Sequence, residues 1–176
     1  MKKGIIALII VAVIAVIVVA AINIYPKLMP MIEDAMAKEV TYTEGDITIT
    51  LPKGFTRSTS LQNNQIDFGN SDCMISILNN SDDFMRENNY ELDDAYDFAK
   101  VFASQHIDAD SREIHTDLEY PYIEYEEKIS NTYYTHFLTF FEGSNGWYTI
   151  CFYCDSNKYY SQRADFVNWA NTIVVK

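Results

Sequence analysis

Residues 122–154 read YIEYEEKISNTYYTHFLTFFEGSNGWYTICFYC, and this stretch has the clearest strand pattern in the 176-residue chain. It contains three segments rich in aromatic and β-branched residues, a composition typical of strands, at 122–129, 133–142 and 147–154. Gly143-Ser144-Asn145-Gly146 separates the last two, and glycine and asparagine accept the positive φ of a tight hairpin turn. The stretch therefore predicts consecutive antiparallel strands.

Shorter strands and two helices are predicted on either side of this stretch. Ile47, Ile49 and Leu51 alternate with threonines in the period-2 pattern of a half-buried strand. Further strands are expected at 55–60, 66–68, 73–78 and 112–118. Apolar residues recur at helical spacing over 91–106, and again in a last helix that Asp155 or Ser156 would cap. The apolar stripe of this last helix is expected to consist of Tyr160, Ala164, Val167, Ala170 and Val174, widened by Phe166, Trp169 and Ile173. The order predicts an α+β fold, with an antiparallel sheet of about six to eight strands and two main helices.

Several of these features together resemble the PsbP-like αβα-sandwich domains. They are Leu51-Pro52-Lys53-Gly54-Phe55 after a short strand, Trp147-Tyr148-Thr149-Ile150 near the end of the meander, and a closing helix through Ile173. The resemblance covers about Asp46 to Val175. Similar domains occur in the photosystem II extrinsic protein and in small bacterial envelope proteins, where they act as binding or scaffold modules. The resemblance thus implies a non-catalytic domain without a cofactor. The chain lacks any metal-site motif of the photosynthetic members, so no functional residue is carried over from them.

A long apolar run precedes the domain. Residues 5–22 contain only Ile, Leu, Val and Ala, and extension to Ile24 gives twenty residues. At about 1.5 Å per residue, a helix of that length spans the roughly 30 Å hydrocarbon core of a bilayer. The sequence predicts a cytoplasmic tail at 1–4, a transmembrane helix at 5–24, a linker at 25–45 and an extracytoplasmic domain at 46–176.

The residues around the apolar run predict its orientation and whether it is cleaved. Lys2 and Lys3 precede the run, which favours a signal-anchor with a cytoplasmic N-terminus. A cleavable signal peptide is the alternative, with small residues for cleavage at Val18-Val19-Ala20 or Val19-Ala20-Ala21. The run exceeds the usual length of a signal-peptide core, and no polar region precedes the cleavage position, so a retained anchor is favoured. We expect localisation in the cell membrane.

The charge of the chain restricts its partners. The formal net charge is −12, and all of the acidic residues follow the apolar run. Such a domain repels phosphate backbones and anionic lipid surfaces, which excludes nucleic acid as a partner by bulk electrostatics. We expect contact with the membrane through residues 5–24, and another envelope protein is a compatible partner.

The three cysteines predict a disulfide rather than a zinc or redox site. Cys151 and Cys154 have C-x-x-C spacing, but residues three apart on a strand point to opposite faces, and no second pair or nearby histidine completes a metal site. In an exported domain, Cys73 is expected to pair with Cys154 or with Cys151 across the sheet. Three buried thiols are the alternative.

The sequence contains no motif for catalysis. It has no G-x-S-x-G elbow and no calcium-loop pattern, and its three histidines are isolated, so no catalytic residue, cofactor or metal site is predicted. Tyrosines are enriched at protein interfaces, and the candidate interface residues are Tyr120, Tyr122, Tyr125, Tyr133 and Tyr134. The sequence predicts a membrane-anchored, non-catalytic binding or scaffold module. The alternative is an envelope hydrolase in which Glu124 and Glu126, on one strand face, act as acid and base.

Overall fold

The computed structural model describes residues 38–59, 65–88, 90–108 and 111–176. Residues 39–176 form one compact unit. The predicted cytoplasmic tail and transmembrane helix lie outside the described residues. Within the described part of the chain, no helix is both long and apolar enough to cross a bilayer.

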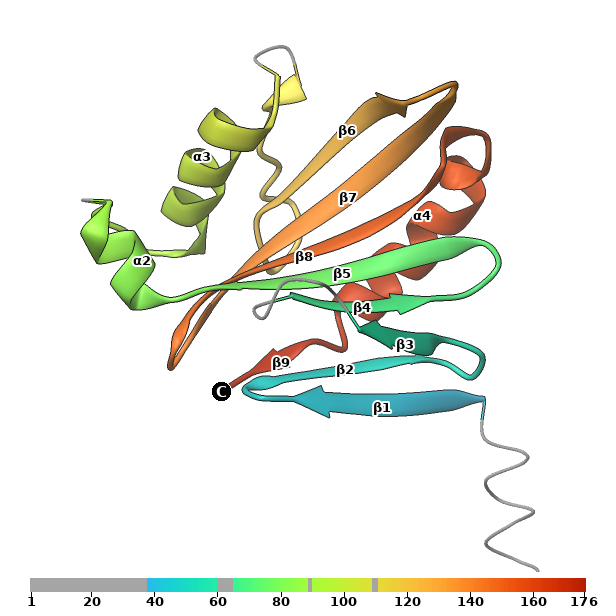
Figure 1. Ribbon diagram of the computed structural model, residues 1–176, viewed down its shortest axis with the longest axis horizontal. Coiled ribbons are helices and arrows are strands. Elements are labelled where there is room, and N and C mark those ends of the chain that lie inside the picture. Colours follow the sequence, from blue (N-terminus) through green and yellow to red (C-terminus); the bar gives the residue numbers. More distant parts are fainter. Residues whose placement is uncertain (1–37, 60–64, 89, 109–110) are drawn as a thin grey trace, which may run out of the picture. The chain divides into compact units, whose positions relative to one another are not determined.

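Six antiparallel strands form the main sheet, in the spatial order β3-β4-β5-β8-β7-β6 (Figure 1). They are β3 (Thr56–Thr59), β4 (Gln65–Gly69), β5 (Cys73–Asn80), β6 (Tyr122–Ile129), β7 (Thr132–Gly143) and β8 (Gly146–Asp155). The predicted meander over 122–154 is confirmed. The predicted strand at 112–118 is wrong, because the chain there makes a single β-bridge, His115 with Tyr122. It must then bend through 117–120 to enter β6.

A second, three-stranded sheet has the order β1-β2-β9 and consists of β1 (Glu39–Glu44), β2 (Ile47–Pro52) and β9 (Val174–Val175). The predicted linker over 25–45 is therefore too long, because β1 pairs with β2 along its whole length. Tyr42 of β1 also packs its ring 4.7 Å from that of Phe68 and donates a hydrogen bond of 2.9 Å to the carbonyl of Phe55. The domain begins at Glu39 rather than at Asp46.

Helices α3 (Ala95–His106) and α4 (Ser156–Ala170) cover opposite faces of the main sheet (Figure 1), and a short helix, α2 (Asp82–Glu87), precedes α3. The Asp94 carboxylate caps α3 by accepting a 2.9 Å hydrogen bond from the amide of Asp97. The Asp155 carboxylate caps α4 in the same way, by accepting from the amide of Asn157 at 2.9 Å. The predicted helices are confirmed, but α3 starts four residues later than expected, and α2 was not predicted.

The predicted stripe of α4 is partly wrong. Tyr160 is 92% exposed, and the residues of α4 that are buried are Tyr159, Phe166 and Ala170. The helix also ends at Ala170, so Val174 lies in β9, where its β-branched side chain suits a strand. Thr172 stabilises the change from helix to strand. Its hydroxyl donates to the carbonyl of Trp169 at 2.7 Å and accepts from the amide of Thr50 at 2.9 Å.

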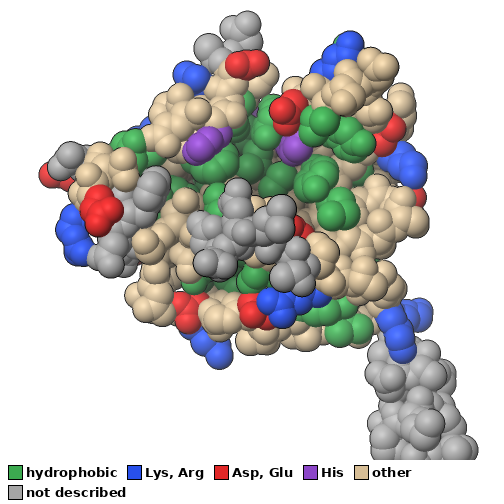
Figure 2. Space-filling model, viewed as in Figure 1, with side chains coloured by type: hydrophobic (Ala, Val, Ile, Leu, Met, Phe, Trp, Pro, Cys, Tyr) green, Lys and Arg blue, Asp and Glu red, His purple; other side chains and the backbone are tan. Residues whose placement is uncertain are grey.

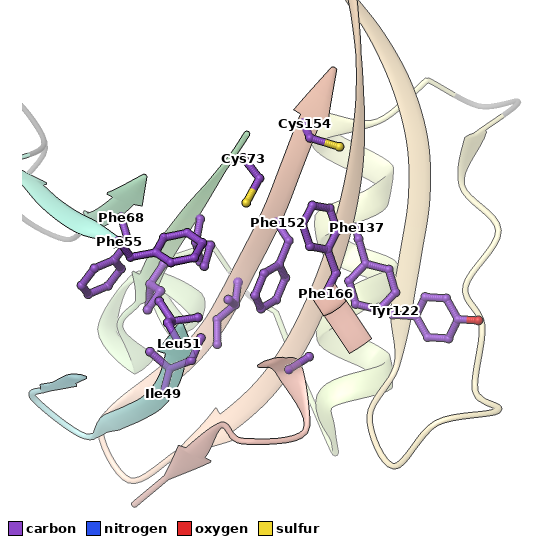
Figure 3. Close-up of a cluster of buried hydrophobic side chains, with 14 of the residues drawn as sticks. Ile49, Leu51, Phe55, Phe68, Cys73, Tyr122, Phe137, Phe152, Cys154 and Phe166 are labelled. Carbon is purple, nitrogen blue, oxygen red and sulfur yellow. The ribbon is translucent and has the colours of Figure 1, made fainter. Parts of the chain in front are cut away.

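Two hydrophobic cores lie on the two faces of the main sheet. One fills the space between the main sheet, the small sheet and α4, and Figure 3 shows Phe152, Phe137 and Phe166 meeting in it. The other lies between the sheet and α3 and contains Phe98, Leu138 and Phe140. Phe137 and Leu138 are neighbours on β7 but belong to different cores, as the alternation of side chains along a strand requires. The α+β class is confirmed, with nine described strands in two sheets.

Candidate binding face

Helix α3 contacts one end of its sheet face. The rings of Phe98 and Phe102 pack 5.7 and 5.5 Å from that of Phe140, and Phe98 lies 5.6 Å from Trp147. His136 is four residues before Phe140 on β7 and on the same face, about 13 Å further along the strand. Figure 2 shows hydrophobic side chains gathered with histidine on the side of the molecule in view. The part of this sheet face around His136, away from α3, is the candidate site.

Three rings form a row across β6, β7 and β8. Tyr125 is the register partner of His136, and His136 is the partner of Tyr153. The rings of Tyr125 and His136 are 4.6 Å apart at 9°, and those of His136 and Tyr153 are 5.3 Å apart at 19°. We call these three residues the aromatic row. The two tyrosines are partly exposed and His136 is 7% exposed, so the accessible surface of the row belongs mainly to the tyrosines.

His136 also brings together a thiol and a carboxylate. Its Nδ1 lies 3.4 Å from Sγ of Cys151, and its Nε2 lies 3.6 Å from a carboxylate oxygen of Glu127. Cysteine, histidine and an acid in this order are the side chains of a thiol hydrolase. Here burial lowers the pKa of His136 to about 4, and burial of the Cys151 sulfur raises the pKa of that thiol to about 12. A thiol nucleophile needs a lowered pKa, so the electrostatics favour a neutral thiol and a neutral ring over catalysis.

The Nε2 atom of His136 is buried and has no hydrogen-bond partner in the described part of the chain. Its distance of 3.6 Å from Glu127 is longer than a hydrogen bond. A buried polar atom without a partner costs about 1 to 3 kcal/mol, so this atom is a place where a bound group would be stabilised.

Two cavities adjoin α3, and His106 lines both; the smaller one is also lined by Tyr125 of the aromatic row. The larger, about 530 Å³, lies between the end of β5 and helices α2 and α3, and includes Leu78, Met85 and Phe102 in its lining. The smaller, about 340 Å³, lies beside β6 and is polar. It is lined by His106, Ile107, Asp108, Ser111, Tyr125, Glu126, Glu127 and Lys128.

The five tyrosines predicted as an interface do not share one surface. Tyr120 and Tyr122 are 6% and 3% exposed, so they belong to the core and have little surface to offer a partner. Tyr125 and Tyr134 lie on the α3 face, and Tyr134 packs edge-on against Tyr153 at 6.5 Å. Tyr133 is 48% exposed and points to the other face. The structure thus brings two of the five together with Tyr153 and His136, which the sequence analysis did not select.

The predicted acid pair occupies one strand face, but one member is already engaged. Glu124 and Glu126 both point toward the α4 side of β6. The guanidinium of Arg163 on α4 donates a hydrogen bond of 2.7 Å to Glu124 and forms an ion pair with it. The arrangement leaves no free pair of carboxylates there. No group of three or more histidine, cysteine, aspartate or glutamate side chains that could hold a metal ion occurs among the described residues.

Cys73 and Cys154 are register partners on β5 and β8, and both are buried as free thiols. Cys151 lies on the opposite face of β8 from Cys154, as its spacing predicts. Figure 3 shows the Cys73 and Cys154 side chains on neighbouring strands with their sulfur atoms pointing in different directions. The register allows the predicted disulfide between Cys73 and Cys154, and it places Cys151 on the wrong face to pair with Cys73.

Comparison with known proteins supports the fold. The sequence matches no protein-family model and no curated protein. The structure is similar to a crystal structure of a protein from Bacteroides thetaiotaomicron VPI-5482, with 14% identity and a TM-score of 0.54 over 80% of this chain and 48% of that one. The chain therefore spans about half the length of that protein. It is also similar to the solution structure of cyanobacterial PsbP (CyanoP) from Synechocystis sp. PCC 6803, with 11% identity and a TM-score of 0.51 over 80% of this chain and 94% of that one. These likenesses show that the domain has a PsbP-like fold.

Proposed function

We propose that this chain is a single-pass membrane protein whose domain, outside the cytoplasm, is a non-catalytic binding or scaffold module for another envelope protein. The observation that carries the proposal is the aromatic row on the part of the sheet face away from α3. Rigid, partly exposed tyrosines lose little entropy when they contact a partner, and such residues are enriched at protein interfaces. The aromatic row, its orphan Nε2 atom and the polar cavity beside Tyr125 together provide shape and polarity for recognition.

The features of the site favour binding over catalysis. The thiol and imidazole next to each other have pKa values shifted away from those that thiol chemistry requires. Glu124, a candidate acid or base, is held by Arg163. The twenty-residue apolar run provides the proposed tether.

Site-specific photo-crosslinking tests the binding role in intact cells. A photoreactive phenylalanine analogue replaces Tyr134, which borders the aromatic row, or Tyr160, which is on α4 and 92% exposed. We expect one adduct of fixed mass from position 134 and none from position 160. The adduct should disappear when Tyr125 and Tyr153 are both changed to alanine. No adduct at position 134, or an adduct that persists in the double variant, contradicts the proposal.

Protease accessibility tests the tether and its orientation. In cells stripped of their outer layers, externally added protease should degrade the domain, and the uncut chain should stay with the membrane after washing at alkaline pH. Recovery of the uncut, unprocessed chain in the soluble fraction would rule out the anchor.

A further inference from the structure

Strand β6 is the last strand of the main sheet, and no other described strand pairs with its outer edge. At its start, Tyr122 exchanges two backbone hydrogen bonds with His115, of 2.8 and 3.1 Å. Because backbone groups alternate in direction along a strand, the amides and carbonyls of Glu124, Glu126 and Lys128 point the same way as those of Tyr122, away from β7. Within the described residues, no backbone group is hydrogen-bonded to these three on that side. The edge can therefore accept another strand.

The edge borders a cavity. The polar cavity of about 340 Å³ has Tyr125, Glu126, Glu127 and Lys128 on its β6 side. A residue of an added strand opposite Tyr125 or Glu127 places its side chain on the α3 face, because directly paired residues share a face. That face is the one on which Tyr125 and His136 stack. An incoming side chain would therefore point toward the cavity.

The charges at the edge favour a basic side chain in that cavity. Glu127, on the α3 face, and Asp108 line it, and Glu126 and Lys128 border it from β6 with their side chains on the other face. Tyr125 stacks one face of its ring on His136 and lines the cavity, so an aromatic ring borders the space that a cation would enter. The orphan Nε2 of His136, whose side chain is 9% exposed, lies 3.6 Å from Glu127 and points independently to a missing polar partner.

We propose that the β6 edge binds an extended basic polypeptide segment, which adds a seventh strand and places a lysine or arginine side chain in the polar cavity. This inference rests on the proposed function, since it names the chemistry of the partner of the same domain. Backbone hydrogen bonds to Glu124, Glu126 and Lys128 hold the segment, and the acidic cavity selects it.

A synthetic strand tests this directly. The full chain in uncharged detergent micelles is titrated with a fluorescein-labelled peptide of about eight residues in which valine and lysine alternate, or valine and glutamate. We expect the lysine peptide to bind at least about tenfold more tightly than the glutamate peptide and to weaken with salt. Hydrogen exchange should slow at the amides of Glu124, Glu126 and Lys128. Equal binding of both peptides, or binding without this protection, would overturn the inference.

Two variants of Glu126 separate the contribution of its backbone amide to peptide binding from that of its side-chain charge. Glu126→Pro removes an outward amide without removing a hydrogen bond to β7, and proline is tolerated at such edge positions. We expect it to weaken lysine-peptide binding about tenfold, whereas Glu126→Gln keeps the amide and should weaken binding less. Asp165→Asn, an exposed change on α4, is the control and should have no effect. If Glu126→Pro fails to fold by circular dichroism, Glu126→Gln with Glu127→Gln tests the charge alone, and unchanged affinity there would refute the acidic selection.

The two proposals fail separately. If position 134 cross-links as expected but the lysine peptide does not bind, the inference about the β6 edge is wrong and the binding function stands. If neither cross-linking nor peptide binding occurs, both are wrong. A detergent-solubilised dimer that disappears in Glu126→Pro would show that a second copy occupies the edge and would also overturn the inference.

Discussion

His136 is a single residue on which much of the candidate site depends. It is an ionisable ring held neutral between two tyrosines and beside a thiol. Burial lowers the pKa of His136 to about 4, because the buried ring loses the water that would stabilise its charged form. The residue therefore links the geometry of the aromatic row to pH.

We expect the stability of the domain to fall as the pH falls from 7 to 5. The folded pKa of about 4 lies below the value of about 6.5 in the unfolded chain, so the unfolded state takes up the proton first. Stability is thus present above the unfolded pKa and is lost in the window between the two values, by about 2 kcal/mol at pH 5. Near-ultraviolet circular dichroism during unfolding measures this change. The signal comes from aromatic residues, and the apolar run contains none, since the first aromatic residue of the chain is Tyr25.

The variant His136→Phe keeps a flat ring and removes the titrating group, so it should flatten this pH dependence. His106→Gln changes an exposed histidine and should leave the dependence as in the parent chain. A flat profile in the parent chain between pH 7 and 5 would show that His136 is not desolvated.

We also expect an oxidised chain to contain one disulfide, between Cys73 and Cys154. The register places them directly opposite, at a Cα separation compatible with a disulfide, after rotation of both side chains. Burial raises the pKa of Cys73 to about 12, so the bond should form before the thiols are buried, by exchange with a disulfide oxidant. Two thiols lose two protons and two electrons, and the oxidant's disulfide becomes two thiols.

Mass spectrometry and thiol titration in denaturant measure this outcome. After refolding with oxidised glutathione, the chain should be about two mass units lighter and should titrate one thiol, Cys151. Cys151→Ser should then titrate none. Three titratable thiols would favour the alternative of buried, unpaired cysteines.

Among the elements, α4 has the largest role in joining the two sheets. Its Phe166 is fully buried, with ring contacts of 5.7 Å to both Phe152 and Trp169. One turn and a half earlier, Tyr160 is 92% exposed on the same helix. The two residues therefore offer a matched comparison of the two sides of α4.

Phe166→Ala should destabilise the domain by about 3 to 5 kcal/mol, because it removes a large side chain from a closed core. Tyr160→Ala should change stability by less than about 0.5 kcal/mol. Thermal unfolding of the two variants measures both values. Equal effects would mean that α4 is rotated relative to the sheet, with the face predicted from the sequence turned inward.

The elements also show what could be predicted from the sequence and what could not. The segment 122–129 was predicted with the bounds of β6, because dense aromatic and β-branched residues and nearby turns mark both of its ends. Strand β1 was missed because EVTYTE has just two apolar side chains, and β9 because two residues cannot show a period. The fate of Val174 depends on pairing with β2, a contact distant in sequence.

The site was harder to predict than the strands, because its residues become neighbours only in one register of strand pairing. Tyr125 could be selected by its residue type, but His136 becomes its neighbour through the turn at Ser130 and Asn131, and Tyr153 joins His136 through the turn between Gly143 and Gly146. A shift of one residue would move His136 to the other face of the sheet. Ser130 has a φ of 58°, a conformation that serine rarely adopts, so the sequence does not announce this two-residue turn.

At the scale of the whole molecule, the domain has one helix-covered core on each side of the main sheet. The two sides differ in the size of the core and in the aromatic surface that they expose. The α4 side joins both sheets through a continuous core and contains the larger cluster of buried residues. The α3 side has the smaller core and the partly exposed aromatic row. If the aromatic row binds the partner, as proposed, the larger core and the binding surface lie on different sides of the sheet.

The last prediction concerns where the domain begins. A fragment of residues 39–176 should unfold cooperatively at the same temperature as the domain in the full chain, because these residues form one compact unit. A fragment of residues 46–176 lacks β1, so β2 loses its partner and Phe68 loses the ring of Tyr42. We expect this shorter fragment to lose about 3 kcal/mol, or roughly 10 °C in Tm. The substitution Tyr42→Ala in the longer fragment should reproduce much of that loss, since Tyr42 also donates a hydrogen bond to Phe55. If both fragments unfold at the same temperature, β1 contributes nothing to the core, and the domain starts at Asp46, as the alternation of Ile47, Ile49 and Leu51 predicts.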